Sequence, residues 1–202
     1  MDTGQWEELL QLVLMRLSKQ IKKRPFLNYK FLNSVFTGLA MGSVFTIYGT
    51  LSPSIFSIGG IFLAIGLLFI AKIYTKILNI KAFFEISIGI EIVMLLMVGY
   101  FLLSPYNYTT AMLVYISYQI SFMFGSYLVR AETVFLSRIK MLSFLDVAKQ
   151  KGYLVGLGVS YVFYESLKYF ETTDNQSQVY FLHFGLFGLE IFVIYFLWKA
   201  FK

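Results

Sequence analysis

Six apolar stretches constrain the fold of this chain more than any other feature of its sequence. They cover residues 31–49, 55–71, 82–103, 109–129, 153–170 and 179–198. A helix of about 20 apolar residues spans the roughly 30 Å hydrocarbon layer of a bilayer. The chain is 58% hydrophobic with a mean hydropathy of +0.70, well outside the range of soluble domains. The sequence therefore predicts an all-α integral membrane protein with six transmembrane helices.

Two segments outside these stretches are long enough to form structure of their own. Residues 1–24 carry apolar side chains at helical spacing, with acidic residues first and basic residues last. This pattern favours an amphipathic helix on the cytoplasmic membrane surface, and docking onto a partner or a second copy is the alternative. Residues 130–151 are expected to form a cytoplasmic connection that also has an apolar helical side. Residues 25–202 as a whole are predicted to form one six-span transmembrane domain.

The basic residues predict how the helices are oriented, because Lys and Arg near span ends stay mostly on the cytoplasmic side. With six spans and a cytoplasmic N-terminus, only Lys168 of the 17 basic residues falls on the outer side. Both termini are therefore expected in the cytoplasm, with the protein in a bacterial inner (plasma) membrane. Topology and attraction to anionic lipid account for the net charge of +6, so we expect no nucleic-acid partner.

Enzymatic chemistry is not expected from this composition. The chain has no cysteine, which removes thiolate metal sites and thiol nucleophiles, and it has a single histidine. The sequence contains no cluster of metal ligands, no nucleophile beside a base and no phosphate-binding loop. We therefore predict no enzymatic activity, no cofactor and no metal.

Small residues repeat every four positions in the first and fifth apolar stretches. The rows consist of Ser34, Gly38, Gly42 and Thr46, and of Gly152, Gly156 and Ser160. Helices in lipid associate through close packing, so such rows mark contact faces. We expect these two helices to be approached closely, by each other or by another chain. Backbone flexibility needed for movement is the alternative interpretation.

Two glutamates lie near the middle of apolar stretches, where a charge is costly and often functional. Glu91 lies in the pentapeptide IGIEI (88–92) and Glu190 in FGLEI (187–191). Each is a candidate for binding and releasing a proton or cation during transport. Each is equally a candidate for a protonated, hydrogen-bonded structural group. The sequence alone does not choose between the two.

Three further residues are candidates for a transport path. His183 lies on nearly the same helix face as Glu190 and could belong to a water-linked proton path. A histidine bonded to a neighbouring helix is the alternative. Tyr115 and Gln119 share one side of the fourth stretch and are predicted to line a polar cavity. Plain helix packing with an interhelical hydrogen bond explains those two equally well.

The two pentapeptides occupy the third and sixth stretches, as they would in two inverted three-helix repeats. Together with the short link AKIYTKILNIK (71–81) and the longer cytoplasmic link, this topology resembles one six-helix half of a major facilitator superfamily transporter. In the short link, Lys76 and Lys81 stand at basic positions of the family's pattern. The family's acidic and glycine positions are occupied here by Thr75, Ala71 and Leu78.

The resemblance implies a transporter with two six-helix halves, so two copies of this chain would enclose a comparable path. It also implies a cavity lined mainly by the first and fourth helices, which fits Glu91 and Glu190 to a dimer seam better than to a cavity. We expect a homodimeric half-transporter of a small solute or ion, with Glu91 or Glu190 handling protons. The alternative is a non-catalytic integral subunit or assembly factor that has other membrane subunits as partners.

Overall fold

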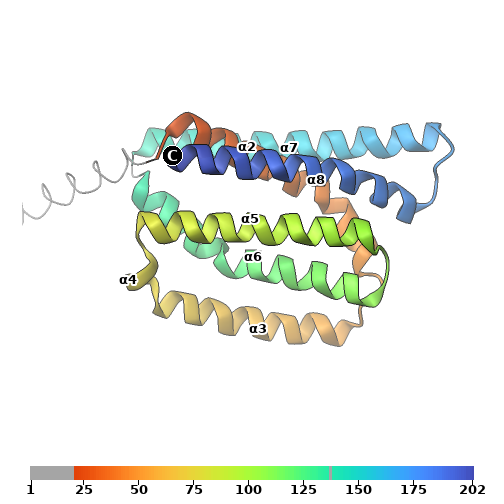
Figure 1. Ribbon diagram of the computed structural model, residues 1–202, viewed down its shortest axis with the longest axis horizontal. Helices are drawn as coiled ribbons and strands as arrows, with labels where there is room; N and C mark the ends of the chain where they lie inside the picture. The colour runs from red at the N-terminus through yellow and green to blue at the C-terminus, as the bar shows by residue number, and fades with distance from the viewer. Residues whose placement is uncertain (1–20, 137) are drawn as a thin grey trace, which may run out of the picture.

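The computed structural model describes residues 21–136 and 138–202, and the regular structure in this part of the chain is entirely α-helical. Six long helices lie lengthwise beside one another (Figure 1). They are α2 (Lys23–Tyr48), α3 (Pro53–Lys72), α5 (Ile80–Leu103), α6 (Tyr108–Phe135), α7 (Ile139–Tyr169) and α8 (Asn175–Phe201). The short helix α4 (Tyr74–Ile77) connects α3 to α5. Most of the predicted N-terminal helix, residues 1–20, lies outside the described residues.

Five helices of the described chain, namely α2, α3, α5, α6 and α8, are long and apolar enough to cross a membrane. This finding supports an integral membrane protein and gives one span fewer than the six predicted. Helix α7 covers the remaining stretch, 153–170, but its glycines, its tyrosines and the Glu165–Lys168 pair lower its hydropathy. A sixth span along α7 therefore stays a prediction.

The segment 130–151 is mostly helical and continuous with its neighbours. Helix α6 continues to Phe135 and α7 begins at Ile139, so residues 136–138 alone separate the two helices. At about 1.5 Å per residue, the 31-residue α7 is roughly 46 Å long, longer than the hydrocarbon layer is thick. Its first half therefore extends the expected fifth span rather than forming a separate helix.

Side-chain caps determine where three of the helices begin. Asn79 accepts a hydrogen bond from the Ala82 N–H at 2.9 Å, and Asn107 accepts one from Thr110 at 2.8 Å. The Asp174 carboxylate accepts a bond from the Ser177 N–H at 2.8 Å. This bond and the Ser177 hydroxyl hold the pKa of Asp174 below its usual value. The caps lie in the polar breaks between apolar stretches, which is why the chain turns there.

Helix α2 lies at the centre of the bundle and packs along both α7 and α8. Helix α5 packs against α8 and α6, whereas α3 packs mainly against α6 at the edge of the molecule (Figure 1). Helices α2 and α6 contact one another only slightly. Helix α2 is therefore closely packed on its α7 and α8 sides, whereas its α6 side is left open.

Glycines bring α2 and α7 into close contact. A Cβ atom on Gly38 would lie 2.9 Å from the Leu157 amide nitrogen and 3.0 Å from the Cα of Gly156. A Cβ on Gly152 would lie 3.0 Å from the Ser34 Cβ. Any side chain at these positions would push the helices apart, so the close approach expected from the small-residue rows is between two helices of this chain. Gly42 is less tightly enclosed, at 3.6 Å from the Tyr164 ring.

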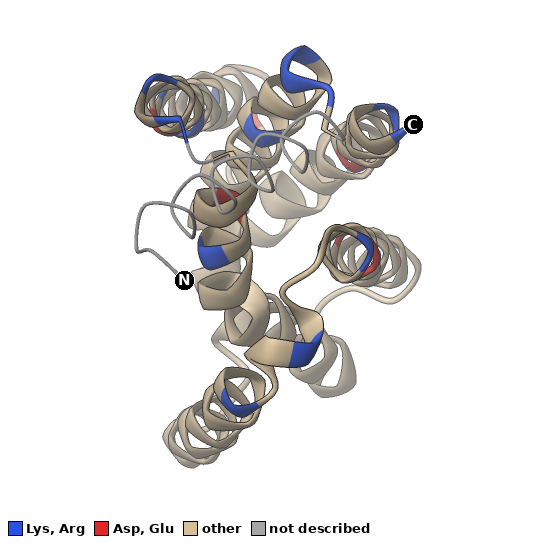
Figure 2. Cartoon of the chain, turned by 90° about the vertical axis from the view of Figure 1, so that its left-hand side faces the viewer, with Lys and Arg blue, Asp and Glu red and all other residues tan. Residues whose placement is uncertain are grey.

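Basic residues gather at the end of the bundle where α2 begins and α8 ends, and Figure 2 looks onto this end. Here we call it the basic end. Of the described Lys and Arg residues, Lys168 alone belongs to the opposite half, because it lies in the last turn of α7. The asymmetry of charge that the sequence predicted along the helices is thus present in the folded bundle.

Candidate functional site

The two midplane glutamates meet at the contact between α5 and α8. Glu91 is 3% exposed and Glu190 is fully buried. Their carboxyl groups lie near each other where these two helices pack together. The matching pentapeptides therefore bring their acids to one point, although those acids are far apart in the sequence. We refer to these two residues as the carboxyl pair.

Helix α2 supplies the hydrogen-bond donors to this pair. The Tyr29 hydroxyl donates to Oε1 of Glu91 at 2.6 Å, and Nδ2 of Asn33 donates to the same oxygen at 2.9 Å. The Thr37 hydroxyl in turn donates to the Asn33 carbonyl at 3.0 Å. Oε1 of Glu91 therefore has two donors, and no hydrogen bond from helix α2 reaches Oε2.

Glu190 has no such donors. Both of its carboxyl oxygens are buried without a hydrogen-bond partner among the described residues. Two ionised carboxylates only accept hydrogen bonds, so they cannot bond to each other. One proton on the pair converts one acid into a donor and satisfies the contact. The arrangement is therefore suited to a pair of acids that holds a single proton.

A third buried acid lies nearer the basic end and is compensated by lysines. Glu132 of α6 is 2% exposed and forms ion pairs with Lys30 of α2 and with Lys149 of α7, the latter at 2.6 Å. The Lys30 ammonium also lies 4.8 Å from the centre of the Tyr29 ring. The hydroxyl of the same tyrosine donates to Glu91. This cluster ties three helices together beside the carboxyl pair.

A cavity of about 210 Å³ opens between α2 and α6, and Glu91 lies in its wall. We call it the α2–α6 groove. Its lining consists of Asn33, Phe36, Thr37, Ala40, Met41, Val44, Phe45, Tyr48, Glu91, Met94, Tyr118, Ser121 and Phe122. Glu91 is the sole charged residue in this lining, and five of the lining residues are aromatic. The groove therefore joins a buried acid to an aromatic surface.

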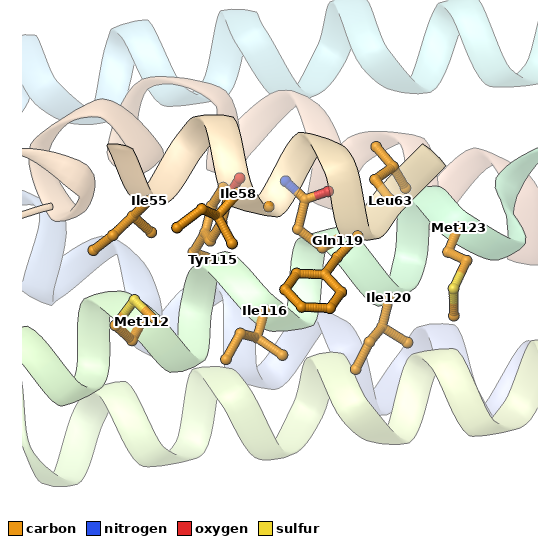
Figure 3. A pocket seen from close by; sticks show the side chains of 11 residues that line it. Ile55, Ile58, Leu63, Met112, Tyr115, Ile116, Gln119, Ile120 and Met123 are labelled. Atoms are coloured by element: carbon orange, nitrogen blue, oxygen red, sulfur yellow. The ribbon is translucent and has the colours of Figure 1, made fainter. Parts of the chain in front are cut away.

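Tyr115 and Gln119, the predicted cavity residues, line a different cavity of about 440 Å³ between α3 and α6 (Figure 3). The remaining side chains around this α3–α6 pocket are apolar. The Tyr115 hydroxyl donates to the Phe56 carbonyl at 3.3 Å, and the buried Oε1 of Gln119 has no hydrogen-bond partner in the described chain. These two residues thus lie apart from the carboxyl pair, on the α3 side of α6.

His183 also lies apart from the carboxyl pair. Its Nδ1 is 2.7 Å from the Val179 carbonyl oxygen, and its ring stacks on Phe101 with centroids 4.0 Å apart. The structure gives no contact between His183 and Glu190 among the described residues. Tyr118, which lines the α2–α6 groove, lies near Glu190 and borders the same packed region as His183. A direct link from His183 to the pair is therefore absent from this arrangement.

Sequence reasoning missed the residues that surround the pair, namely Tyr29, Lys30, Asn33, Tyr118 and Glu132. Asn33 was the available signal, because an amide inside an apolar stretch needs a partner in the membrane. Lys30 and Glu132 lie at stretch ends, where charges normally reach water, so the sequence gives no sign of a buried ion pair. Only the folded arrangement brings them together.

The site can bind a proton, or a cation, between buried acids. No group of three or more His, Cys, Asp or Glu side chains suited to a metal ion occurs among the described residues. No protein-family model, no curated protein and no solved structure matches the chain. The carboxyl pair and the α2–α6 groove are therefore the features of the described chain that bear on its function.

Proposed function

We propose that the chain is a proton-coupled membrane transporter of a small solute or ion, of the half-transporter type, acting as a homodimer. The observation that carries this proposal is the meeting of two buried carboxyl groups, one of which lines a groove. Acids at membrane depth are costly, and proton relays are a common reason for their presence. Loading and release of the shared proton on Glu91 and Glu190 would couple proton movement to solute movement.

The pattern of helix contacts supports an inverted repeat. Exchanging α2 with α6, α3 with α7 and α5 with α8 turns the α2–α7 contact into the α6–α3 contact. The same exchange turns α2–α8 into α6–α5 and leaves α5–α8 in place. Two three-helix units related by a two-fold axis in the membrane plane have this pattern. Glu91 and Glu190 occupy equivalent positions beside that axis, in keeping with the resemblance to half of a major facilitator superfamily transporter.

The open side between α2 and α6 supports a homodimer. These are the first and fourth long helices, which the family resemblance assigns to the central cavity. The groove between them exposes Phe45 by 71% and Phe122 by 59%. A second copy facing this side would enclose the groove and complete a path. Glu91 reaches that path although its helix, α5, is not one of the two lining helices.

Orientation with both termini in the cytoplasm belongs to the same proposal. The basic end would then face the cytoplasm, and the Lys30–Glu132–Lys149 cluster would lie between the carboxyl pair and that surface. Tyr115, Gln119 and His183 remain candidates for the path in a second conformation of the transporter, since alternating access moves one repeat against the other.

Proteoliposomes that contain a pH-sensitive dye test the proposal. A panel of anionic, neutral and cationic solutes is applied as outward or inward gradients, and the proton flux is recorded. We expect at least one solute to drive proton flux through wild-type protein, and Glu91→Gln and Glu190→Gln to abolish it. Glu165→Gln is the matched control, because Glu165 is about half exposed and pairs with Lys168. Flux that is unchanged in both pair variants would remove the proton role.

Helix α3 favours a second candidate function, that of a subunit in a larger membrane complex. Ile70 is its only buried residue, so nearly all of its apolar surface is free to meet lipid or another protein. The mass of the purified particle in mild detergent distinguishes the two functions. A homodimer supports the transporter, and constant recovery with unrelated chains at fixed stoichiometry supports the subunit.

A further inference from the structure

We infer that the α2–α6 groove is a binding site for a monovalent organic cation with an apolar body, such as an aryl-alkyl ammonium, which exchanges with the proton of the carboxyl pair. This inference rests on the proposed function, because it names the solute class that the proton would exchange with.

The charge of the groove selects cations over anions. Glu91 is its one charged lining residue, and no Lys, Arg or His belongs to the lining. The nearest buried lysine, Lys30, is already paired with Glu132. A bound anion would therefore meet a carboxylate and no free positive charge. A cation would meet the charge that it needs in a site with little water, where opposite charges attract strongly.

The walls suit a cation with an apolar body rather than a small hydrated ion. Phe36, Phe45, Tyr48, Tyr118 and Phe122 supply aromatic surface along the groove. Aromatic faces attract organic ammonium groups, and recognition of quaternary ammonium by such surfaces is common. Calcium and magnesium sites usually draw on several carboxylates or carbonyls, whereas Glu91 is the one carboxylate in this lining and most of the wall is apolar.

The hydrogen bonds around Glu91 leave one oxygen free for a ligand. Tyr29 and Asn33 both donate to Oε1, and this pairing holds the carboxylate in one orientation. Oε2 is then the oxygen left for the proton of the pair and for a ligand in the groove. A cation approaching Oε2 competes directly with that proton.

The exchange balances in charge. A pair of carboxylic acids with one shared proton carries a net charge of −1. When a monovalent cation binds and the proton leaves, the two carboxylates and the cation again sum to −1. The buried site therefore keeps the same net charge in both states, and this avoids the large cost of changing the charge in a low-dielectric region. One proton is released to water for each cation bound.

Binding to the full-length protein in detergent tests the inference without requiring transport. Benzyltrimethylammonium is the probe, and benzylsulfonate, of similar shape and opposite charge, is the matched control. We expect saturable binding of the cation by calorimetry, with release of about one proton per site in weakly buffered solution. Affinity should fall as the pH is lowered, because protons compete. Benzylsulfonate should not bind.

Two variants localise the site. Glu91→Gln should weaken cation binding by about tenfold or more, because the partner charge is lost. Phe122→Ala should weaken it a few-fold, by loss of about 1 kcal/mol of cation–π attraction, while proton release per bound cation stays the same. Because Phe122 is 59% exposed, this second variant is expected to fold normally. Equal binding of cation and anion, affinity unchanged in Glu91→Gln, or no saturable binding would overturn the inference.

The outcomes separate this inference from the proposed function. If proteoliposomes couple protons to a neutral or anionic solute through Glu91, and the groove does not bind the cation, the function stands and the inference is wrong. If the groove binds the cation with release of a proton, and no solute moves across the membrane, the site stands and the transporter proposal is wrong.

Discussion

Glu132 and the Glu91–Glu190 pair are buried acids of the same helix bundle, but their charges are compensated in different ways. Glu132 has two lysine partners, Lys30 and Lys149. Within residues 21–136 and 138–202, the pair has hydrogen-bond donors at Glu91 and no cation in contact, and Glu190 has no donor from outside the pair. An acid that is ion-paired with two lysines is already held as a carboxylate and has no proton to exchange. We propose that the acids without such partners load and unload a proton or a cation, so the same residue type would serve structure at one site and exchange at the other.

Glu132→Gln should have the largest effect on stability. It leaves Lys30 buried without a counter-charge, and breaking a buried ion pair in this way costs about 3–5 kcal/mol of unfolding free energy. Thermal or denaturant unfolding in detergent measures the loss. Glu165→Gln is the control, since its exposed pair with Lys168 should contribute little. Wild-type stability in Glu132→Gln would mean that the cluster is not structural.

Gly156→Val should have the next largest effect on stability, because it disrupts the contact between α2, which carries Lys30, and α7, which carries Lys149. The added side chain would meet the Cα of Gly38 and the Leu39 amide nitrogen, each about 3.0 Å from its Cβ. Overpacking of this kind costs about 1–3 kcal/mol of unfolding free energy. Gly158→Val is the matched control on the same helix, since nothing lies within 4 Å of a Cβ there. Equal melting temperatures of the two variants would contradict the close α2–α7 contact.

Tyr29→Phe should have a moderate effect and should sharpen the difference between the two acid sites. It removes the 2.6 Å bond to Glu91 while keeping the aromatic ring beside Lys30. Loss of a bond to a charged group costs about 1.5–3 kcal/mol, and less when the acid carries a proton. We expect a destabilisation near the lower bound, together with altered proton release from the pair. Tyr161→Phe, at an exposed position of α7, should change neither quantity.

Glu190→Gln should have the smallest effect on stability and the clearest effect on function. The amide keeps the shape of the acid, and its N–H group can donate to Glu91 without uptake of a proton from water. The free energy of unfolding should therefore change by less than about 1 kcal/mol. The same substitution would thus be severe at Glu132 and mild at Glu190. Proton flux in proteoliposomes should nevertheless be lost. A large loss of stability in Glu190→Gln would assign the pair to structure.

Part of this arrangement could be predicted from the sequence. The apolar stretches correspond to long helices because each supplies enough uninterrupted apolar surface, and the polar caps Asn79, Asn107 and Asp174 fall between them. The small-residue rows point to α2 and α7, which do pack closely. The matching pentapeptides pointed to Glu91 and Glu190 together, because they place the two acids at similar depths on α5 and α8, which pack against each other.

The rest depends on which way each helix is rotated, and periodicity does not determine this in lipid. Tyr115 and Gln119 share a face of α6, yet that face meets α3, whereas Tyr118 and Phe122 face the groove. A helix apolar on all sides carries no marker of which side meets which neighbour. The Lys30–Glu132 pair was equally hidden, because its partners are far apart in the sequence. Long-range contacts of this kind follow from the assembled bundle.

Infrared spectroscopy of the carboxyl pair tests the central claim most directly. A protonated carboxyl group has a C=O stretching band that shifts in deuterated water and is distinct from carboxylate bands. We expect such a band in wild-type protein near neutral pH, its loss in Glu190→Gln, and its persistence in Glu165→Gln. We also expect benzyltrimethylammonium to remove the band as the proton leaves. Absence of the band from wild-type protein, or its persistence in Glu190→Gln, would contradict a proton shared by Glu91 and Glu190.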